Sequence, residues 1–97
     1  MSGIGVGAER RRFVIAGNVQ GAGFLVWVRN VAHSLELTGS ASLMGDGRCE
    51  AVVQGNRQLV KQFGIACKRG PGAIALEIVE QQSQPLDPKL TAFVLHH

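Results

Sequence analysis

The chain has 97 residues, of which 45% are hydrophobic and 18% are charged, and its formal net charge at pH 7 is +3. This composition is typical of a soluble globular protein, and no apolar run approaches the length of a transmembrane helix. The length suits one two-layer domain. Aromatic residues make up 5% of the chain and tyrosine is absent, which argues against a base-stacking nucleic-acid surface. We therefore expect no membrane and no nucleic acid among the partners.

The N-terminal segment 1–9 is rich in glycine and lacks the long apolar core of a signal peptide. We expect it to be a disordered tail, followed by a single domain over residues 10–97. Arg10, Arg11 and Arg12 form the only basic run. Just before a strand, such a run is usually a solvated edge, but it could also draw anions toward the loop that follows.

Two cysteines, Cys49 and Cys67, have neither disulfide-framework nor metal-ligand spacing. Each lies in an apolar segment, so we interpret both as small buried hydrophobic side chains in a reducing compartment. The expected location is the cytoplasm, and the sequence predicts no metal and no cofactor.

Hydrophobic periodicity and turn residues predict seven elements. Apolar residues at helical spacing predict the two helices. Asn56 is expected to be the N-cap of the second helix, and residues 70–72 are expected to end it. Residues 38–39 are expected to be a turn, Gly45, Asp46 and Gly47 a hairpin turn, and residues 81–89 a polar loop. In chain order, the elements are a strand at 11–16, a helix from 24 to about 36, strands at 40–44 and 48–54, a helix after 56, and strands at 74–79 and 91–95.

The order β-α-β-β-α-β, with a possible fifth short strand, determines the fold class. Right-handed crossovers and one apolar stripe per helix predict a four- or five-stranded, mostly antiparallel sheet with both helices on one face. This is an α/β (α+β) ferredoxin-like sandwich. His96 and His97 are expected to be an unstructured end.

Glycines at 17, 21 and 23 separate the first strand from the first helix. Glycines let the main chain turn tightly and approach a bound atom closely, and the helix start supplies unpaired N–H groups with the positive end of the dipole. These features favour phosphate, sulfate or carboxylate, although such glycines can also serve only to bend the chain. The predicted anion-binding residues are Asn18, Val19, Gln20, Gly21, Ala22 and Gly23.

Several motifs of the chain resemble the acylphosphatase family. They are GNVQGAGF at 17–24, VR at 28–29, LTG at 37–39, DGRCEA at 46–51 and GPGA at 70–73. The resemblance extends over residues 11–95, and it implies a ferredoxin-like enzyme that hydrolyses the carboxyl–phosphate bond of acyl phosphates.

Both side chains that carry the chemistry in that family are replaced here. The resemblance places the phosphate-clamping arginine at Leu25 and the water-positioning asparagine at Leu43. Leucine can neither pair with a phosphoryl group nor orient water, and a comparable arginine contributes on the order of 10³–10⁵ in rate in other phosphoryl-transfer enzymes. Ser42 should face away from the site by strand alternation, and His33 should lie on the solvated side of its helix.

Three hypotheses for the function remain open. The first is an acylphosphatase-like protein that binds an anion in its glycine loop but lacks efficient hydrolysis. The second is an active acylphosphatase in which Arg29, one helical turn beyond Leu25, replaces the missing arginine. The third is a non-catalytic interaction or regulatory module. The expected partner in the first two is phosphate, sulfate or an acyl-phosphate-like anion, and we expect a monomer.

Overall fold

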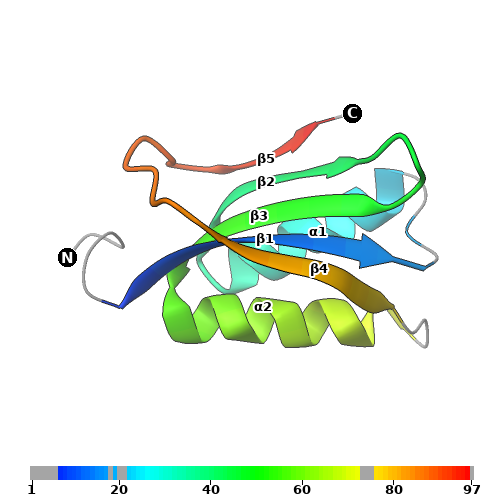
Figure 1. Cartoon of the computed structure of the whole chain (residues 1–97), viewed down its shortest axis with the longest axis horizontal. Coiled ribbons are helices and arrows are strands. Elements are labelled where there is room, and N and C mark those ends of the chain that lie inside the picture. Colours follow the sequence, from blue (N-terminus) through cyan, green and yellow to red (C-terminus); the bar gives the residue numbers. More distant parts are fainter. Residues whose placement is uncertain (1–6, 18, 20–21, 73–75, 97) are drawn as a thin grey trace.

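A computed structural model of the chain describes residues 7–17, 19, 22–72 and 76–96. Within these ranges the chain forms five strands and two helices (Figure 1). They are β1 (Ala8–Ala16), α1 (Ala22–Ser34), β2 (Thr38–Leu43), β3 (Cys49–Asn56), α2 (Arg57–Arg69), β4 (Glu77–Gln84) and β5 (Phe93–His96). The sheet order is β4-β1-β3-β2-β5, and only the β2–β5 pair is parallel.

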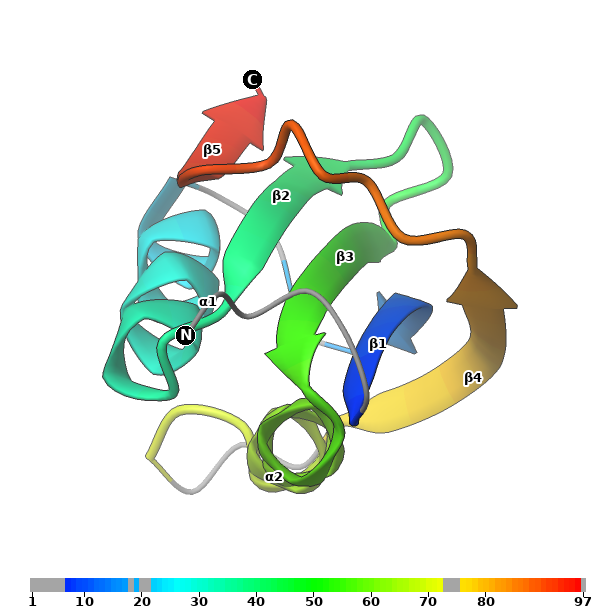
Figure 2. The ribbon, with the colours of Figure 1, turned by 90° about the vertical axis from the view of Figure 1, so that its left-hand side faces the viewer.

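Both helices lie on the same face of the sheet (Figure 2). The core between the two layers contains Phe13 and Val53 from the strands and Val28 and Phe63 from the helices, all at most 1% exposed. The predicted ferredoxin-like sandwich is therefore confirmed, with β5 as the additional strand beside β2. None of the described helices has the length and apolar character needed to cross a membrane.

Helix α2 forms where local signals are strongest. The side chain of Asn56 accepts a hydrogen bond from the backbone N–H of Gln58 at 2.8 Å, which confirms the predicted N-cap. The apolar stripe of α2 packs on the sheet, and the Phe63 ring lies 5.5 Å from the ring of Phe13. Gly70, with a φ of +70°, follows the last helical residue, and its N–H donates to the carbonyl of Ala66.

Strand β3 also follows its sequence pattern. Cys49, Ala51 and Val53 point into the core, and each is fully buried. Both cysteines are free and buried as predicted, and burial raises the pKa of the Cys49 thiol to about 11 and that of Cys67 to about 12. Neither thiol is therefore in a state to act as a nucleophile near neutral pH.

The first half of the chain differs from prediction at three boundaries. Strand β1 begins at Ala8, so Ala8 and Glu9 belong to the domain and not to a tail. Helix α1 begins earlier and ends earlier than predicted, and its last turn is closed by Glu36 at a φ of +56°. The predicted turn at 38–39 is instead the start of β2. Gly39 is needed there because a Cβ would lie 1.8 Å from the carbonyl oxygen of Val52 on β3.

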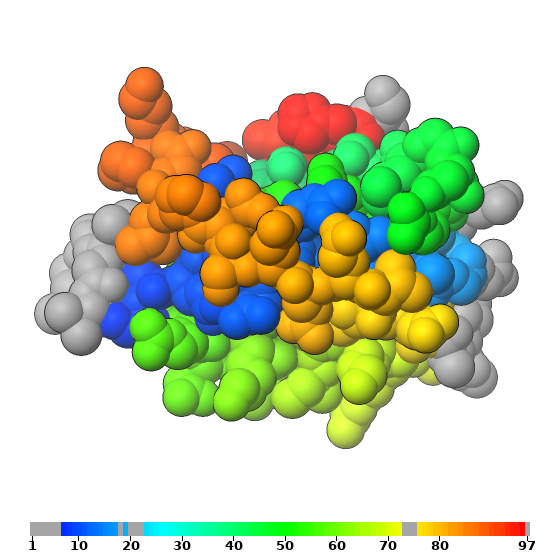
Figure 3. All heavy atoms as spheres, viewed as in Figure 1, coloured from blue at the N-terminus to red at the C-terminus, as the bar shows by residue number. Residues whose placement is uncertain are grey.

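The C-terminal part differs more. Strand β4 continues to Gln84, so residues 81–84 pair with β1 and are not part of a polar loop. It is an edge strand, and most of its side chains are exposed (Figure 3). His96 pairs with Ser42 as the end of β5 and is not an unstructured terminus. Residues 73–75 and 97 lie outside the described residues.

Candidate anion-binding site

The segment between β1 and α1 is the predicted anion-binding site. Asn18, Gln20 and Gly21 lie outside the described residues. Val19 is fully buried, and its N–H donates to the carbonyl of Gly17 at 2.9 Å. Gly17 has a φ of +125°, a conformation that favours glycine. Of the described residues, Gly17 therefore marks a turn at the end of β1, and Val19 places its side chain in the core.

Ala22 and Gly23 open the first turn of α1, and Gly23 is exposed. A Cβ at Gly23 would meet nothing within 4 Å, so internal packing does not require a glycine at this position. The first turn of α1 contains no acidic residue. The first N–H groups of a helix lack helical partners and carry partial positive charge, so an anion can approach this end of α1 without repulsion from a carboxylate of that turn.

Sheet topology brings Leu43 to the same end of the molecule as this helix start. Strands β1 and β2 each pair antiparallel with β3, so both run in one direction and end on one side (Figure 1). Leu43 is the last residue of β2 and pairs with Cys49, so its side chain lies on the face that the helices cover. The predicted site elements therefore share one end of the sandwich.

The two leucines have different environments. Leu25 is 1% exposed and belongs to the hydrophobic core, on the side of α1 that packs against the sheet. Leu43 is 40% exposed, beyond the edge of the core. Neither side chain offers a hydrogen-bonding group.

The other polar candidates lie on α1 and β2. Arg29 on α1 is half-buried, and its Nε is buried without a hydrogen-bond partner among the described residues. His33 is exposed in the last turn of α1, as expected. Ser42 precedes Leu43 in β2 and so faces the opposite side of the sheet.

The basic run does not form a solvated edge, because β1 lies between β3 and β4 in the middle of the sheet. Arg10 donates to the carbonyl of Pro85 at 3.2 Å. The guanidinium of Arg11 pairs with Glu9, with Nη2 2.5 Å from the carboxylate. By strand alternation Arg12 lies on the face opposite to Arg11, where it makes contacts of its own, so the three arginines make separate contacts within the fold.

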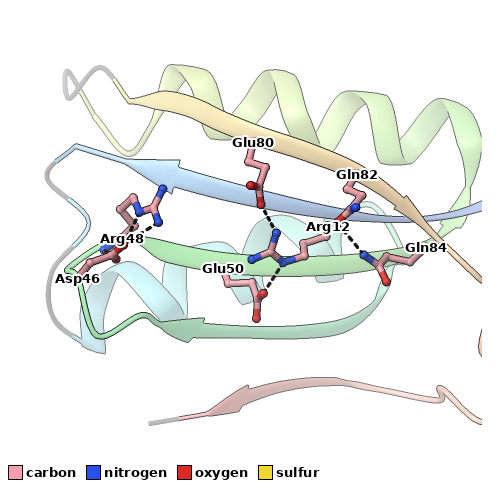
Figure 4. A network of polar contacts seen from close by, with 7 residues as sticks. All are labelled: Arg12, Asp46, Arg48, Glu50, Glu80, Gln82 and Gln84. Carbon is pink, nitrogen blue, oxygen red and sulfur yellow. Dashed lines mark hydrogen bonds and ion pairs between the residues drawn. The ribbon is translucent and has the colours of Figure 1, made fainter.

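Arg12 connects three strands on the open face of the sheet (Figure 4). Its Nε contacts Glu50 of β3 and its Nη1 contacts Glu80 of β4. The hydrogen bonds that Arg12 donates, first to Glu50 and then to Glu80, raise the pKa of Arg12. Val14 is paired with Glu50 on β3 and with Glu80 on β4. It lies on the face of the sheet that the helices do not cover, yet it is only 1% exposed, because these charged side chains shield it from solvent. Sequence reasoning missed this cluster, because only strand register brings the charges together.

A second ion pair closes the β2–β3 hairpin. Arg48 donates to Asp46 from Nε at 2.7 Å and from its backbone N–H at 3.1 Å, and both side chains are partly exposed (Figure 4). The hydrogen bond from the Arg48 side chain lowers the pKa of Asp46. Gly47 has a φ of +88°, which confirms the predicted Asp-Gly turn. This hairpin lies at the same end as Leu43 and uses its arginine internally.

Comparisons with known proteins agree with this fold. A family model described as acylphosphatase matches residues 11–95. The acylphosphatase of Rhodopseudomonas palustris is 36% identical over 76 residues, covering 77% of each chain. That of Syntrophotalea carbinolica is 42% identical over 78 residues, covering 73% of this chain and 85% of its own. A crystal structure of acylphosphatase from Bacillus subtilis shares the fold, with a TM-score of 0.82 over 91% of this chain and 98% of its own at 24% identity. The chain belongs to the acylphosphatase family.

Proposed function

We propose that this chain binds phosphate-type anions through the main chain of residues 18–23 and hydrolyses acyl phosphates only poorly. The observation that carries the proposal is the burial of Leu25. This side chain is 1% exposed in the core, at the position where the resemblance to the family expects a phosphate-clamping arginine. A side chain packed into the core supplies no charge to a bound phosphoryl group.

The expected loss of rate follows from the demands of phosphoryl transfer. The protein must place the reactants and stabilise charge on the equatorial oxygens, and an arginine can do both through paired hydrogen bonds. Losing one such arginine corresponds to roughly 10³–10⁵ in rate. Leu43 at the second family position leaves the attacking water without a side-chain amide to hold it in line.

Anion binding should persist because main-chain donors do not depend on side-chain identity. The acid-free first turn of α1 and the net charge of +3 favour it further. The proposal includes a monomeric, cytoplasmic chain, which size-exclusion chromatography and cell fractionation would test.

The test is hydrolysis of benzoyl phosphate by the purified full chain, beside the Rhodopseudomonas palustris relative. We expect turnover several orders of magnitude below that of an enzyme with the family arginine, and a large rise in the variant that combines Leu25→Arg with Leu43→Asn. Leu43→Asn alone is the matched control, since it changes only the exposed site. Turnover by the unmodified chain at the level of the relative would refute the loss of hydrolysis.

Inorganic phosphate tests the binding half of the proposal. Millimolar phosphate should raise the Tm of the unmodified chain more than chloride at equal ionic strength, because a ligand that binds only the folded state stabilises it. This measurement needs no variant, so it holds even if Leu25→Arg does not fold. Equal Tm values in the two salts would refute anion binding.

Arg29 supports a second candidate function, an active acylphosphatase with a replacement arginine. The supporting observation is its buried Nε, which has no hydrogen-bond partner among the described residues and would be satisfied by an acceptor from outside them. If this candidate is correct, Arg29→Ala should abolish a measurable hydrolysis and Arg29→Lys should retain part of it. A variant as active as the unmodified chain would exclude Arg29 from the reaction.

A further inference from the structure

A groove of about 680 Å³ runs between α2 and the strands β1 and β4. Ile78 forms its apolar floor, above Gly64 and the buried ring of Phe13, and a Cβ on Gly64 would lie 3.1 Å from that ring. Figure 3 shows blue atoms of β1 between the orange atoms of β4 and the green atoms of α2. None of the described residues between 17 and 25 lines the groove, which distinguishes it from the candidate anion-binding site.

The charge of the groove is strongly one-sided. Among the residues that the structure describes, its lining contains five cationic residues and one acid, namely Arg10, Arg11, Arg57, Lys61 and Lys68 with Glu9. Glu9 is paired with Arg11 and so neutralises none of the α2 cations. Within the described ranges, Lys61 and Lys68 make no ion pair with a carboxylate within 4 Å. The α2 wall therefore presents positive charge beside an apolar floor.

We propose that this groove binds a small amphipathic anion, a molecule with a carboxylate or phosphate head on an apolar chain or ring. The volume lies within the range of about 300–1,000 Å³ that small-molecule sites occupy. The head would pair with Lys61 and Lys68, and the body would lie on Ile78, which is half-buried. Ile65, which is 44% exposed on the rim, would lose its contact with water on binding.

If the proposal is correct, a ligand of the groove needs both a negative charge and an apolar body. The probes are chosen to separate these two features. Octanoate carries both features, acetate carries only the charge, and octylammonium carries the chain with the opposite charge. In a titration followed by amide NMR, octanoate should give saturable shifts in α2 at residues 61–68 and in β4 at 78–83. Acetate and octylammonium should leave these amides unchanged. Saturable shifts with all three, or with none, would overturn the proposal.

Two charge-reversal variants separate a site from general electrostatic attraction. Lys61→Glu with Lys68→Glu changes two lining residues, and Arg69→Glu with Lys89→Glu makes the same change in net charge at exposed residues outside the lining. The first pair should raise the Kd for octanoate by about tenfold or more, because a charge-assisted hydrogen bond is worth roughly one decade of affinity. The second pair should change it by less than about twofold, since these charges are screened by solvent.

All four changed residues are exposed, and each variant reverses one cation in the last turn of α2, so urea titrations should show both variants folded with similar midpoints. Equal weakening by the two pairs would overturn the assignment of a site. Failure of octanoate binding can be distinguished from failure of the proposed function, because the phosphate test depends on residues 18–23 and not on the groove.

Discussion

Replacing Leu25 and Leu43 separately by alanine tests whether the two leucines differ as their burial indicates. Leu25 is 1% exposed, so Leu25→Ala removes buried methyl groups and leaves a cavity between α1 and the sheet. Such changes lower the free energy of unfolding by about 2–5 kcal/mol, and the Tm of a domain of this size by at least about 8 °C. Leu43 is 40% exposed, so Leu43→Ala should change the free energy of unfolding by only about 0.5 kcal/mol.

The assay is urea unfolding followed by circular dichroism, with the midpoint and the slope m compared for each variant. Val26→Ala provides a control on the same helix, since Val26 is 37% exposed, and it should behave like Leu43→Ala. A loss below about 1 kcal/mol for Leu25→Ala, at unchanged m, would refute the assignment of Leu25 to the core. It would also remove the observation on which the proposed loss of hydrolysis depends.

The same reasoning constrains Leu25→Arg. An arginine here either buries its guanidinium among apolar side chains or turns outward and leaves the cavity that alanine leaves. Its free energy of unfolding should therefore be no higher than that of Leu25→Ala in phosphate-free buffer. If the guanidinium reaches the anion-binding segment, added phosphate should reduce the difference in free energy of unfolding between Leu25→Arg and the unmodified chain.

Three further changes test the fold around the site. Gly39→Ala should lower the free energy of unfolding by more than about 4 kcal/mol in urea titrations, because its Cβ would lie 1.8 Å from the Val52 carbonyl oxygen; a mild effect would contradict this close approach. Gln54→Ala should cost about 1–3 kcal/mol by the same measurement, since Gln54 is 3% exposed and holds the loop before β5 through two hydrogen bonds of 2.7 and 2.9 Å. The pKa of Asp46 is lowered by Arg48, so its contribution to stability is present above the unfolded pKa and should disappear as the pH falls below about 4. The Tm of Asp46→Asn should therefore fall less between neutral and acid pH than that of the unmodified chain, because this variant has no Asp46 contribution to lose.

Elements with a complete local signal could be predicted from the sequence. Helix α2 has an N-cap, an apolar stripe and a glycine stop, and each of these acts within a few residues. Strand β3 alternates because one of its faces packs against the helices. The glycine-rich segment was correctly placed between β1 and α1.

The errors occur where a partner distant in sequence decides the structure. Strand β4 has few apolar residues because it is an edge strand with most side chains exposed, so residues 81–84 resemble a loop until β1 supplies their hydrogen bonds. Arg12 in a central strand is acceptable only because Glu50 and Glu80 lie on either side of it. Gly39 belongs to a strand because Val52 approaches it so closely, and no local pattern indicates this approach.

In the proposed anion binding, the main chain and the side chain at position 25 contribute separately, so a substitution at position 25 can remove the side-chain contribution and leave the main-chain contribution in place. The described part of the connection from β1 to α1 depends on Gly17, on the buried Val19 and on the packing of α1, and none of these requires a charged residue at position 25. A leucine there adds apolar burial, so stability favours keeping it even where hydrolysis would favour arginine. Restoring the charge therefore opposes the packing of the core, whereas restoring an amide at the exposed position 43 does not. We accordingly expect Leu43→Asn to be the readily accepted half of the double variant, and Leu25→Arg to be the half that lowers stability.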